Sequence, residues 1–190
     1  MDRWDLATVW FIHRAFVRSS MAKSDSFFIR KTLNAGNTAT FAQTEIDLGA
    51  YVDALGKSVL RIHNVQATYS DNAGTSSTIN PGETGVAQWQ LTTQSQTDTV
   101  RDDDRSVISS GRCHMHNAAT TAGLADTVTD ANGLNPQYFT NGYLVAVESI
   151  YLGGEASAGF AGNAYITVVL ECTVETMNQS SAMALALSQQ

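Results

Sequence analysis

The residues with the clearest potential for chemistry lie in the run Cys113-His114-Met115-His116. Thiolates and imidazoles are ligands for zinc and related metals. If this run is a strand, His114 and His116 share one face and Cys113 points to the other, because side chains alternate along a strand. A metal-dependent enzyme of the cupin type would add His63 from a facing strand. The chain has only four histidines, so we favour ordinary polar histidines on a solvated face.

A second cluster, Asp102-Asp103-Asp104, lies between Arg101 and Arg105. Calcium takes about six to eight oxygen ligands, often from loops, which makes these three carboxylates a candidate calcium site. The spacing and the glycine of an EF-hand loop are absent, so we favour a solvated turn that its own arginines neutralise. The sequence also lacks a Gly-x-Ser-x-Gly elbow, a Walker loop and a Cys-x-x-Cys pair. We therefore predict no catalytic residue, no bound metal, no cofactor and no small-molecule substrate.

The elements that would position such residues belong to one domain, since the chain has 190 residues and a mass of 20.4 kDa. Charged residues make up 15% of it, against about 25% in typical soluble domains. Two cysteines are too few for a disulfide framework. Stability must then come from a packed core, which a chain of this length can form.

Charge is unevenly distributed along the chain. The formal net charge is −7, but residues 1–31 hold six basic and three acidic residues, a net charge of +3. The remainder, at −10, is a poor surface for nucleic acid, because affinity for phosphate comes largely from Lys and Arg. The first twenty residues are also rich in aromatic residues, and their longest apolar run, Val9 to Ile12, is far shorter than the ~20 residues of a membrane span. This segment is either an arm that contacts a membrane surface or a neighbouring subunit, or a leader ahead of Met21.

From residue 38 onward, apolar residues recur with period two in short runs, which predicts β-strands. The predicted strands cover residues 40–48, 59–69, 86–93, 106–110, 113–117, 143–151 and 164–177. The last two are expected to form an antiparallel hairpin around the Gly-rich stretch 153–162. Helical character is confined to residues 50–55, 124–128 and 182–187.

This pattern predicts an all-β fold, an antiparallel β-sandwich in the form of a single jelly roll. An immunoglobulin-like sandwich is disfavoured because Trp89 precedes both cysteines. The expected organisation is an N-terminal basic and aromatic arm or leader (1–31), a jelly-roll body (32–177) and a C-terminal tail (178–190).

The body resembles the small single jelly-roll coat proteins of tailless icosahedral viruses, including viruses with an internal membrane. The resemblance is carried by the stretches SVLRIHNVQATYS, VAQWQLTTQ with the following DDDR turn, GYLVAVESIYLGG and AYITVVLECTVETM, within about residues 38–177. It implies a structural protein of the virion that assembles with copies of itself and other capsid subunits, and not an enzyme.

The resemblance also implies that the N-terminal arm contacts genome, an inner membrane or neighbouring subunits. The arm residues expected to do so are Arg3, Trp4, Trp10, Arg14, Arg18, Lys23, Arg30 and Lys31. Six basic residues cannot neutralise a packaged genome, so an inner membrane or separate packaging proteins are expected beneath such a shell.

Two other functions fit the same predicted fold. A carbohydrate-binding, lectin-like jelly roll would stack exposed aromatic rings on sugars, and Trp89, Tyr138 and Tyr143 are its candidates. A cupin-like metal enzyme, the third possibility, would need the three histidines named above on facing strands.

Overall fold

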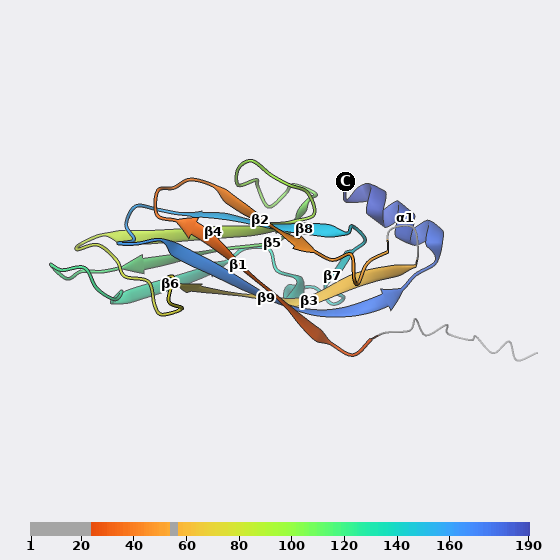
Figure 1. Ribbon diagram of the computed structural model, residues 1–190, viewed down its shortest axis with the longest axis horizontal. Helices are drawn as coiled ribbons and strands as arrows, with labels where there is room; N and C mark the ends of the chain where they lie inside the picture. The colour runs from red at the N-terminus through yellow and green to blue at the C-terminus, as the bar shows by residue number, and fades with distance from the viewer. Residues whose placement is uncertain (1–23, 54–56) are drawn as a thin grey trace, which may run out of the picture.

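Two antiparallel sheets and a C-terminal helix make up the computed structural model, which describes residues 24–53 and 57–190 (Figure 1). The smaller sheet has the order β1–β9–β3–β7, with β1 at Phe27–Gly36, β9 at Ala164–Thr176, β3 at Ser58–Ser70 and β7 at Tyr143–Val145. The larger sheet has the order β2–β8–β4–β5–β6, with β2 at Ala42–Asp47, β8 at Ser149–Ala156, β4 at Thr84–Thr92, β5 at Val107–His116 and β6 at Thr127–Asn132. A 3-10 turn, η1 (Pro136–Tyr138), precedes β7, and helix α1 spans Gln179–Ser188.

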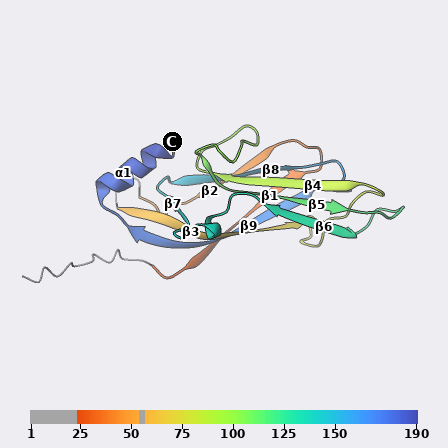
Figure 2. The ribbon, with the colours of Figure 1, turned by 180° about the vertical axis from the view of Figure 1, so that it is seen from behind.

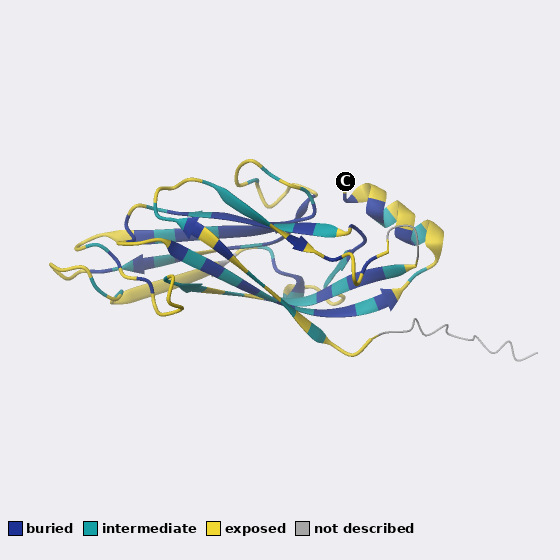
Figure 3. Cartoon of the chain, in the orientation of Figure 1, coloured by how far each residue is buried: buried dark blue, intermediate teal, exposed yellow. Residues whose placement is uncertain are grey.

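The strands form where the sequence alternates between apolar and polar residues. On β9, Ile166, Val168, Leu170 and Cys172 are fully buried, while the residues between them are only partly buried. β9 pairs with β3 from Ser58↔Thr176 to Ser70↔Tyr165, so these two strands form the middle of the smaller sheet. Figure 3 shows the same alternation of buried and exposed positions along several strands.

The strand order is that of a jelly roll. When β6 is set aside, the remaining eight strands lie in the orders β1–β9–β3–β7 and β2–β8–β4–β5, and the chain passes from sheet to sheet as two Greek keys require. The prediction of an antiparallel β-sandwich with jelly-roll topology is therefore confirmed. β6 is an addition to the free edge of the larger sheet.

The hairpin predicted for the last two strands is wrong. β8 pairs with β2 and β4, whereas β9 pairs with β1 and β3. The loop between β8 and β9 thus crosses from one sheet to the other, and the strand predicted at 143–151 divides into β7 and β8 because the chain also changes sheets there. Alternation reveals which face of a strand is buried but not which strand lies beside it.

Two strands, β1 and β6, form where the periodicity predicts none. The helix predicted at 124–128 does not form, and residues 127 and 128 belong to β6 instead. Thr127, Val128 and Thr129 are β-branched and favour strands. The helix predicted at 50–55 is also wrong over its described part, where Tyr51 N–H donates to Leu48 O at 2.8 Å in a turn.

The space between the sheets is filled with side chains. Trp89, Leu91, Ile150 and Phe160 are among the buried members of one continuous apolar cluster. At Gly85 an added Cβ would lie 2.9 Å from the side chains of Ile79 and Phe160, so only glycine fits there. The interior is a packed core.

Helix α1 confirms the helical character predicted at 182–187 and closes one end of the sandwich (Figure 2). Asn178 caps it, accepting from Ser181 N–H at 2.8 Å. Ala182 and Ala186 are buried with Val59 and Ala146 in a small second cluster. None of the helices in residues 24–53 and 57–190 has the length and apolarity of a membrane span.

A buried ion pair joins β3 to β9 within the smaller sheet, and its arginine also contacts the segment that precedes β7. Arg61 donates from Nε to Glu175 Oε1 at 2.7 Å and from Nη2 to Oε2 at 2.8 Å. Its third nitrogen, Nη1, donates to the carbonyl of Asn141. The Glu175 side chain is 0% exposed and that of Arg61 11%, so the two charges neutralise each other away from water.

Candidate functional site

The three candidate metal-binding histidines do not come together. His63 lies on β3 in the smaller sheet, where Nε2 is 2.9 Å from Thr173 Oγ1. His116 lies on β5 in the larger sheet, with Nδ1 3.0 Å from Thr84 Oγ1. The packed core separates the two sheets, and no group of three His, Cys, Asp or Glu residues in the described ranges is placed to hold a metal ion. The site of a cupin-like enzyme is therefore not assembled from these residues.

The cysteines are poorly suited to nucleophilic or metal chemistry. Burial, reinforced by the nearby Asp130, raises the pKa of the Cys113 thiol to about 12. Burial, with Glu171 nearby, raises the pKa of the Cys172 thiol to about 12 as well. Because the thiolate is the reactive form, both groups are inert near neutral pH.

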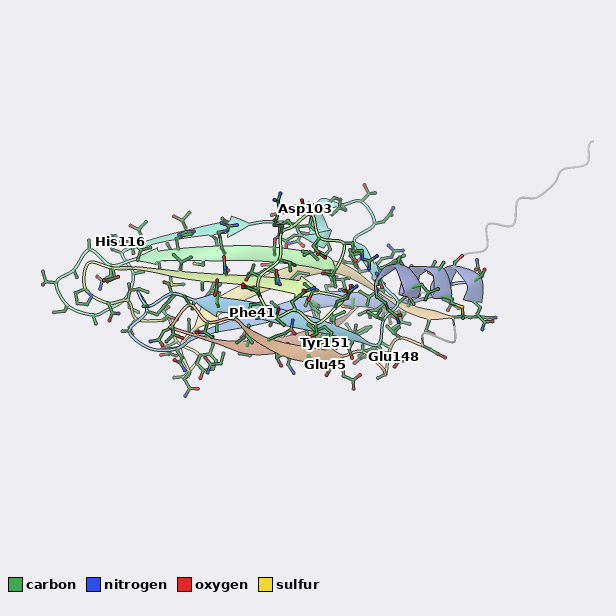
Figure 4. All side chains as sticks on the ribbon, turned by 90° about the horizontal axis from the view of Figure 1, so that it is seen from above. Phe41, Glu45, Asp103, His116, Glu148 and Tyr151 are labelled. Carbon is green, nitrogen blue, oxygen red and sulfur yellow. The ribbon has the colours of Figure 1, made fainter. Side chains whose placement is uncertain are left out.

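The acidic cluster has partners of its own within the β4–β5 loop. Asp104 Oδ1 accepts from Ser106 N–H at 2.8 Å and from Ser106 Oγ at 2.7 Å, and these bonds lower the pKa of the Asp104 carboxyl. Asp103 lies 3.3 Å from Arg101 Nε in a largely exposed ion pair. The histidines of β5 do not add to this cluster, because His116 lies near one end of the molecule, far from Asp103 (Figure 4). Asp104 thus caps the turn before β5, Asp103 is paired with Arg101, and Asp102 lines the hollow described below.

Of the three aromatic residues considered for sugar stacking, Trp89 is part of the core. It is 3% exposed, Nε1 donates to Tyr69 Oη at 3.1 Å, and the ring fills the space that a side chain at position 111 would need. Tyr143 is partly buried, and burial raises the pKa of its hydroxyl. Tyr138 is 64% exposed and is the most accessible of the three.

The β4–β5 loop covers a polar hollow of about 590 Å³ on the outer face of the larger sheet. The loop is held by Gln90, whose buried amide donates from Nε2 to Asp98 O at 3.3 Å and accepts at Oε1 from Val100 N–H at 2.9 Å. Gln88 donates to Glu155 at 2.5 Å on its floor. The charged residues that line it are Asp98, Arg101, Asp102, Arg112 and Glu155. Such a mixture can hydrogen-bond polar groups but contains no nucleophile with an adjacent base.

The amino-acid sequence does not signal this hollow. A glutamine that alternates with apolar residues looks like a solvent-facing strand residue, and nothing in the sequence signals that a distant loop covers it.

Six of the eight arm residues lie outside the described residues: Arg3, Trp4, Trp10, Arg14, Arg18 and Lys23. The other two, Arg30 and Lys31, lie on β1, which begins at Phe27. The Arg30 guanidinium is 5.5 Å from the centre of the Phe28 ring. The edge of the smaller sheet therefore positions these two charges.

Large apolar side chains are exposed in several separate places. They are Phe28 and Tyr51; Leu124 and Val128; Tyr138 and Phe139; and Met183 and Leu187 on α1, a helix without any charged residue. The loop from β5 to β6, which carries Leu124, lies at the opposite end of the molecule from α1 (Figure 1). An apolar hollow of about 400 Å³ lies beside Leu134, Phe139 and Tyr143. Contiguous apolar patches mark contacts with other molecules, whereas single exposed apolar residues are normal on a protein surface.

No protein-family model and no curated protein matches the sequence. Among solved structures, the chain is similar to Desmodium yellow mottle tymovirus at 14% identity, with 90% of this chain and 96% of the other covered and a TM-score of 0.38. It is similar to VP1 of Trichodysplasia spinulosa-associated polyomavirus in complex with GM1 oligosaccharide at 9% identity, with coverages of 80% and 95% and a TM-score of 0.36. It is also similar to Cocksfoot mottle virus at 11% identity, with coverages of 96% and 98% and a TM-score of 0.29. These neighbours are viral capsid proteins. The similarity is distant, and the jelly-roll assignment rests on the strand order of this chain.

Proposed function

We propose that the chain is a structural coat subunit of a virus, which assembles with copies of itself and with other capsid subunits into an icosahedral shell and catalyses no reaction. The observation that carries the proposal is the separation of the exposed apolar side chains around a solid body. A subunit of a closed shell needs neighbours on several sides, whereas an enzyme or lectin needs one concave site. The packed interior and the dispersed exposed apolar side chains favour the first arrangement, and the polar hollow under the β4–β5 loop contains no nucleophile with an adjacent base.

The composition of the body supports the same function. Interface cores are depleted in charge, and charged residues make up only 15% of this chain. Helix α1 is the clearest case, because it exposes Met183 and Leu187 and has no charged side chain in any position. Its exposed side chains mix Met183 and Leu187 with the uncharged polar Gln179, Ser180 and Ser188, so a neighbouring subunit could cover this surface without burying a charge.

The role of the N-terminal arm is part of this proposal. Basic and aromatic residues such as Arg3, Trp10 and Arg18 would contact genome, an inner membrane or neighbouring subunits. With few bases available, we propose an inner membrane or separate packaging proteins beneath the shell, and a virion location for the chain.

The test is electron microscopy combined with sedimentation, on versions of the protein that begin at Met1 and at Met21. Shells, rings or tubes that sediment far above a 20.4 kDa species are the expected result. A difference between the two versions would show that the arm assists assembly. A monomer or dimer in both versions, across salt and calcium concentrations, would overturn the coat function.

Substitutions at the two ends of the body sharpen this test. Leu124→Ser and Leu187→Ser each remove one exposed apolar contact, so both should reduce assembly without unfolding the subunit. Ser188→Ala, on the same helix, is the matched control and should assemble normally. Unchanged assembly in both leucine variants would contradict the proposed role of these contacts.

A further inference from the structure

In the part of the chain that the structure describes, four strands lie at sheet edges, and three of them carry features that discourage pairing with another chain. β7 has only three residues, β1 carries Arg30 and Lys31, and β2 carries Glu45 and Asp47. Short length and edge charges are the usual ways in which proteins protect an exposed edge. β6 is different, because its six residues, TVTDAN, include one charged side chain and no proline.

β6 is also the most exposed strand of the described chain. Residues 127–131 are all exposed, and Val128 is 58% exposed. The strand pairs with β5 on one side, from Gly111↔Asn132 to His116↔Thr127, and no described strand pairs with its other side (Figure 2). It lies outside the eight strands of the jelly roll, so the core does not account for it. An unprotected edge with β-branched residues is a template for a further strand.

The sequence of β6 matches a second copy of itself in one antiparallel register. A two-fold axis perpendicular to the sheet keeps each face of the joined sheet continuous. Two residues directly opposite each other must then point to the same face, so their sequence numbers differ by an even number. A register centred on Asp130 puts its carboxylate opposite its own copy, and one centred on Val128 puts Asp126 opposite Asp130. Like charges directly opposite are destabilising. The register centred on Thr129 avoids both, because it places Thr129 opposite itself and Val128 opposite Asp130. It also pairs residues 127–131 with one another, whereas registers centred on Thr127 or Ala131 pair at most three residues of the strand.

We propose that β6 is a contact between two copies of this chain, in which the β6 strands pair antiparallel about a two-fold axis at Thr129. The pairing joins the two larger sheets into one continuous sheet of ten strands. The contact goes beyond the coat function and does not depend on it, because it follows from the sheet edge alone.

Cysteine cross-linking tests the register directly. In the full-length protein, Thr129→Cys places two thiols opposite each other, with Cα atoms about 4.5–5.5 Å apart, within the range of a disulfide. Mild oxidation should then give a covalent dimer. Ala131→Cys is the matched control. In this register Ala131 lies opposite Thr127, four residues from the other copy of Ala131, so the two introduced thiols are about 13 Å apart along the strands. The native cysteines, Cys113 and Cys172, are buried and should not interfere. A dimer from both variants in equal yield, or from neither, would overturn the proposal.

Charge exchange at the same position provides a second measurement. Thr129→Lys and Thr129→Asp should each weaken dimerisation about fivefold, because each puts like charges opposite each other. An equal mixture of the two should restore it, and Thr129→Val should associate like the unmodified chain. Analytical ultracentrifugation measures the dissociation constants, and near-ultraviolet circular dichroism checks that each variant is folded. A mixture that associates no better than either variant alone would contradict the contact.

The two proposals fail separately. Chains that form β6 dimers but never shells would overturn the coat function and leave this contact in place. Shells that form equally well in all Thr129 variants would overturn this contact and leave the coat function in place.

Discussion

Removing one partner of the Arg61–Glu175 ion pair should be among the most destabilising single changes in the smaller sheet. Arg61→Met leaves the Glu175 carboxylate, which is 0% exposed, without its two charge-assisted hydrogen bonds. It also removes the donor to the carbonyl of Asn141. Breaking a buried pair in this way costs about 3–5 kcal/mol of unfolding free energy. For a chain of this size that corresponds to a fall in Tm of about 6–20 °C.

The double variant Arg61→Met with Glu175→Leu is the informative comparison. It removes both charges and leaves apolar side chains of similar volume, a change that is often neutral or stabilising in other proteins. We therefore expect it to recover most of the stability that Arg61→Met loses. Arg101→Met is the matched control, because the Arg101–Asp103 pair is largely exposed and should contribute less than about 1 kcal/mol.

Urea unfolding, followed by far-ultraviolet circular dichroism at low protein concentration, gives the unfolding free energies of the unmodified protein and the three variants. A cost below about 1 kcal/mol for Arg61→Met would refute the reasoning, since it would mean that water reaches and solvates the Glu175 carboxylate. A double variant no more stable than Arg61→Met would also refute it. The loss would then come from packing and not from the hydrogen bonds that Arg61 donates to the carboxylate.

Three further predictions concern the core, a loop and acid pH. Gln90→Leu removes the hydrogen bonds that hold the β4–β5 loop, so proteolysis of that loop should become faster and unfolding should cost about 1–3 kcal/mol less. Cys113 and Cys172, with pKa values raised to about 12, should not react with a thiol reagent at pH 8 until the protein unfolds; fast labelling of folded protein would contradict their burial. Hydrogen bonds from Thr75 lower the pKa of the exposed Asp71 carboxyl below 3.8, so its contribution to stability is present above pH 3.8 and is lost as the pH falls through the lower folded pKa. Carboxyl chemical shifts in a pH titration should show this lowered midpoint, and Thr75→Val should raise it.

Much of the sandwich was predictable because its central strands alternate so clearly. β9 buries every second residue from Ile166 to Cys172, and the sequence shows that pattern directly. β1 was not predictable in the same way, because Lys31 interrupts the apolar alternation of Phe27, Ile29 and Leu33. β6 has no core-facing pattern to detect, since it is stabilised by its pairing with β5 and not by burial.

The candidate sites were harder to predict than the fold. The spacing of His114 and His116 shows correctly that they share a face, but it contains no information on which sheet holds His63. The role of Gln90 depends on backbone groups eight to ten residues away in a loop that folds back over its strand. Such contacts arise from tertiary packing, which local sequence patterns do not record.

The place of β9 in the smaller sheet has a consequence for the order in which the protein can fold during synthesis. β9 is the last of the described strands to leave the ribosome, yet it lies between β1 and β3, and its pairing partners are made 95 to 145 residues earlier, from Ser70↔Tyr165 to Phe27↔Cys172. Until Thr176 has been translated, the place of β9 between β1 and β3 is unfilled. The backbone hydrogen bonds of the smaller sheet then cannot run from β1 to β3. Pairing over such sequence separations is intrinsically slow. The smaller sheet thus gains its final hydrogen bonding only after β9 has been translated, and until then β1 and β3 are open edges to which another strand could pair.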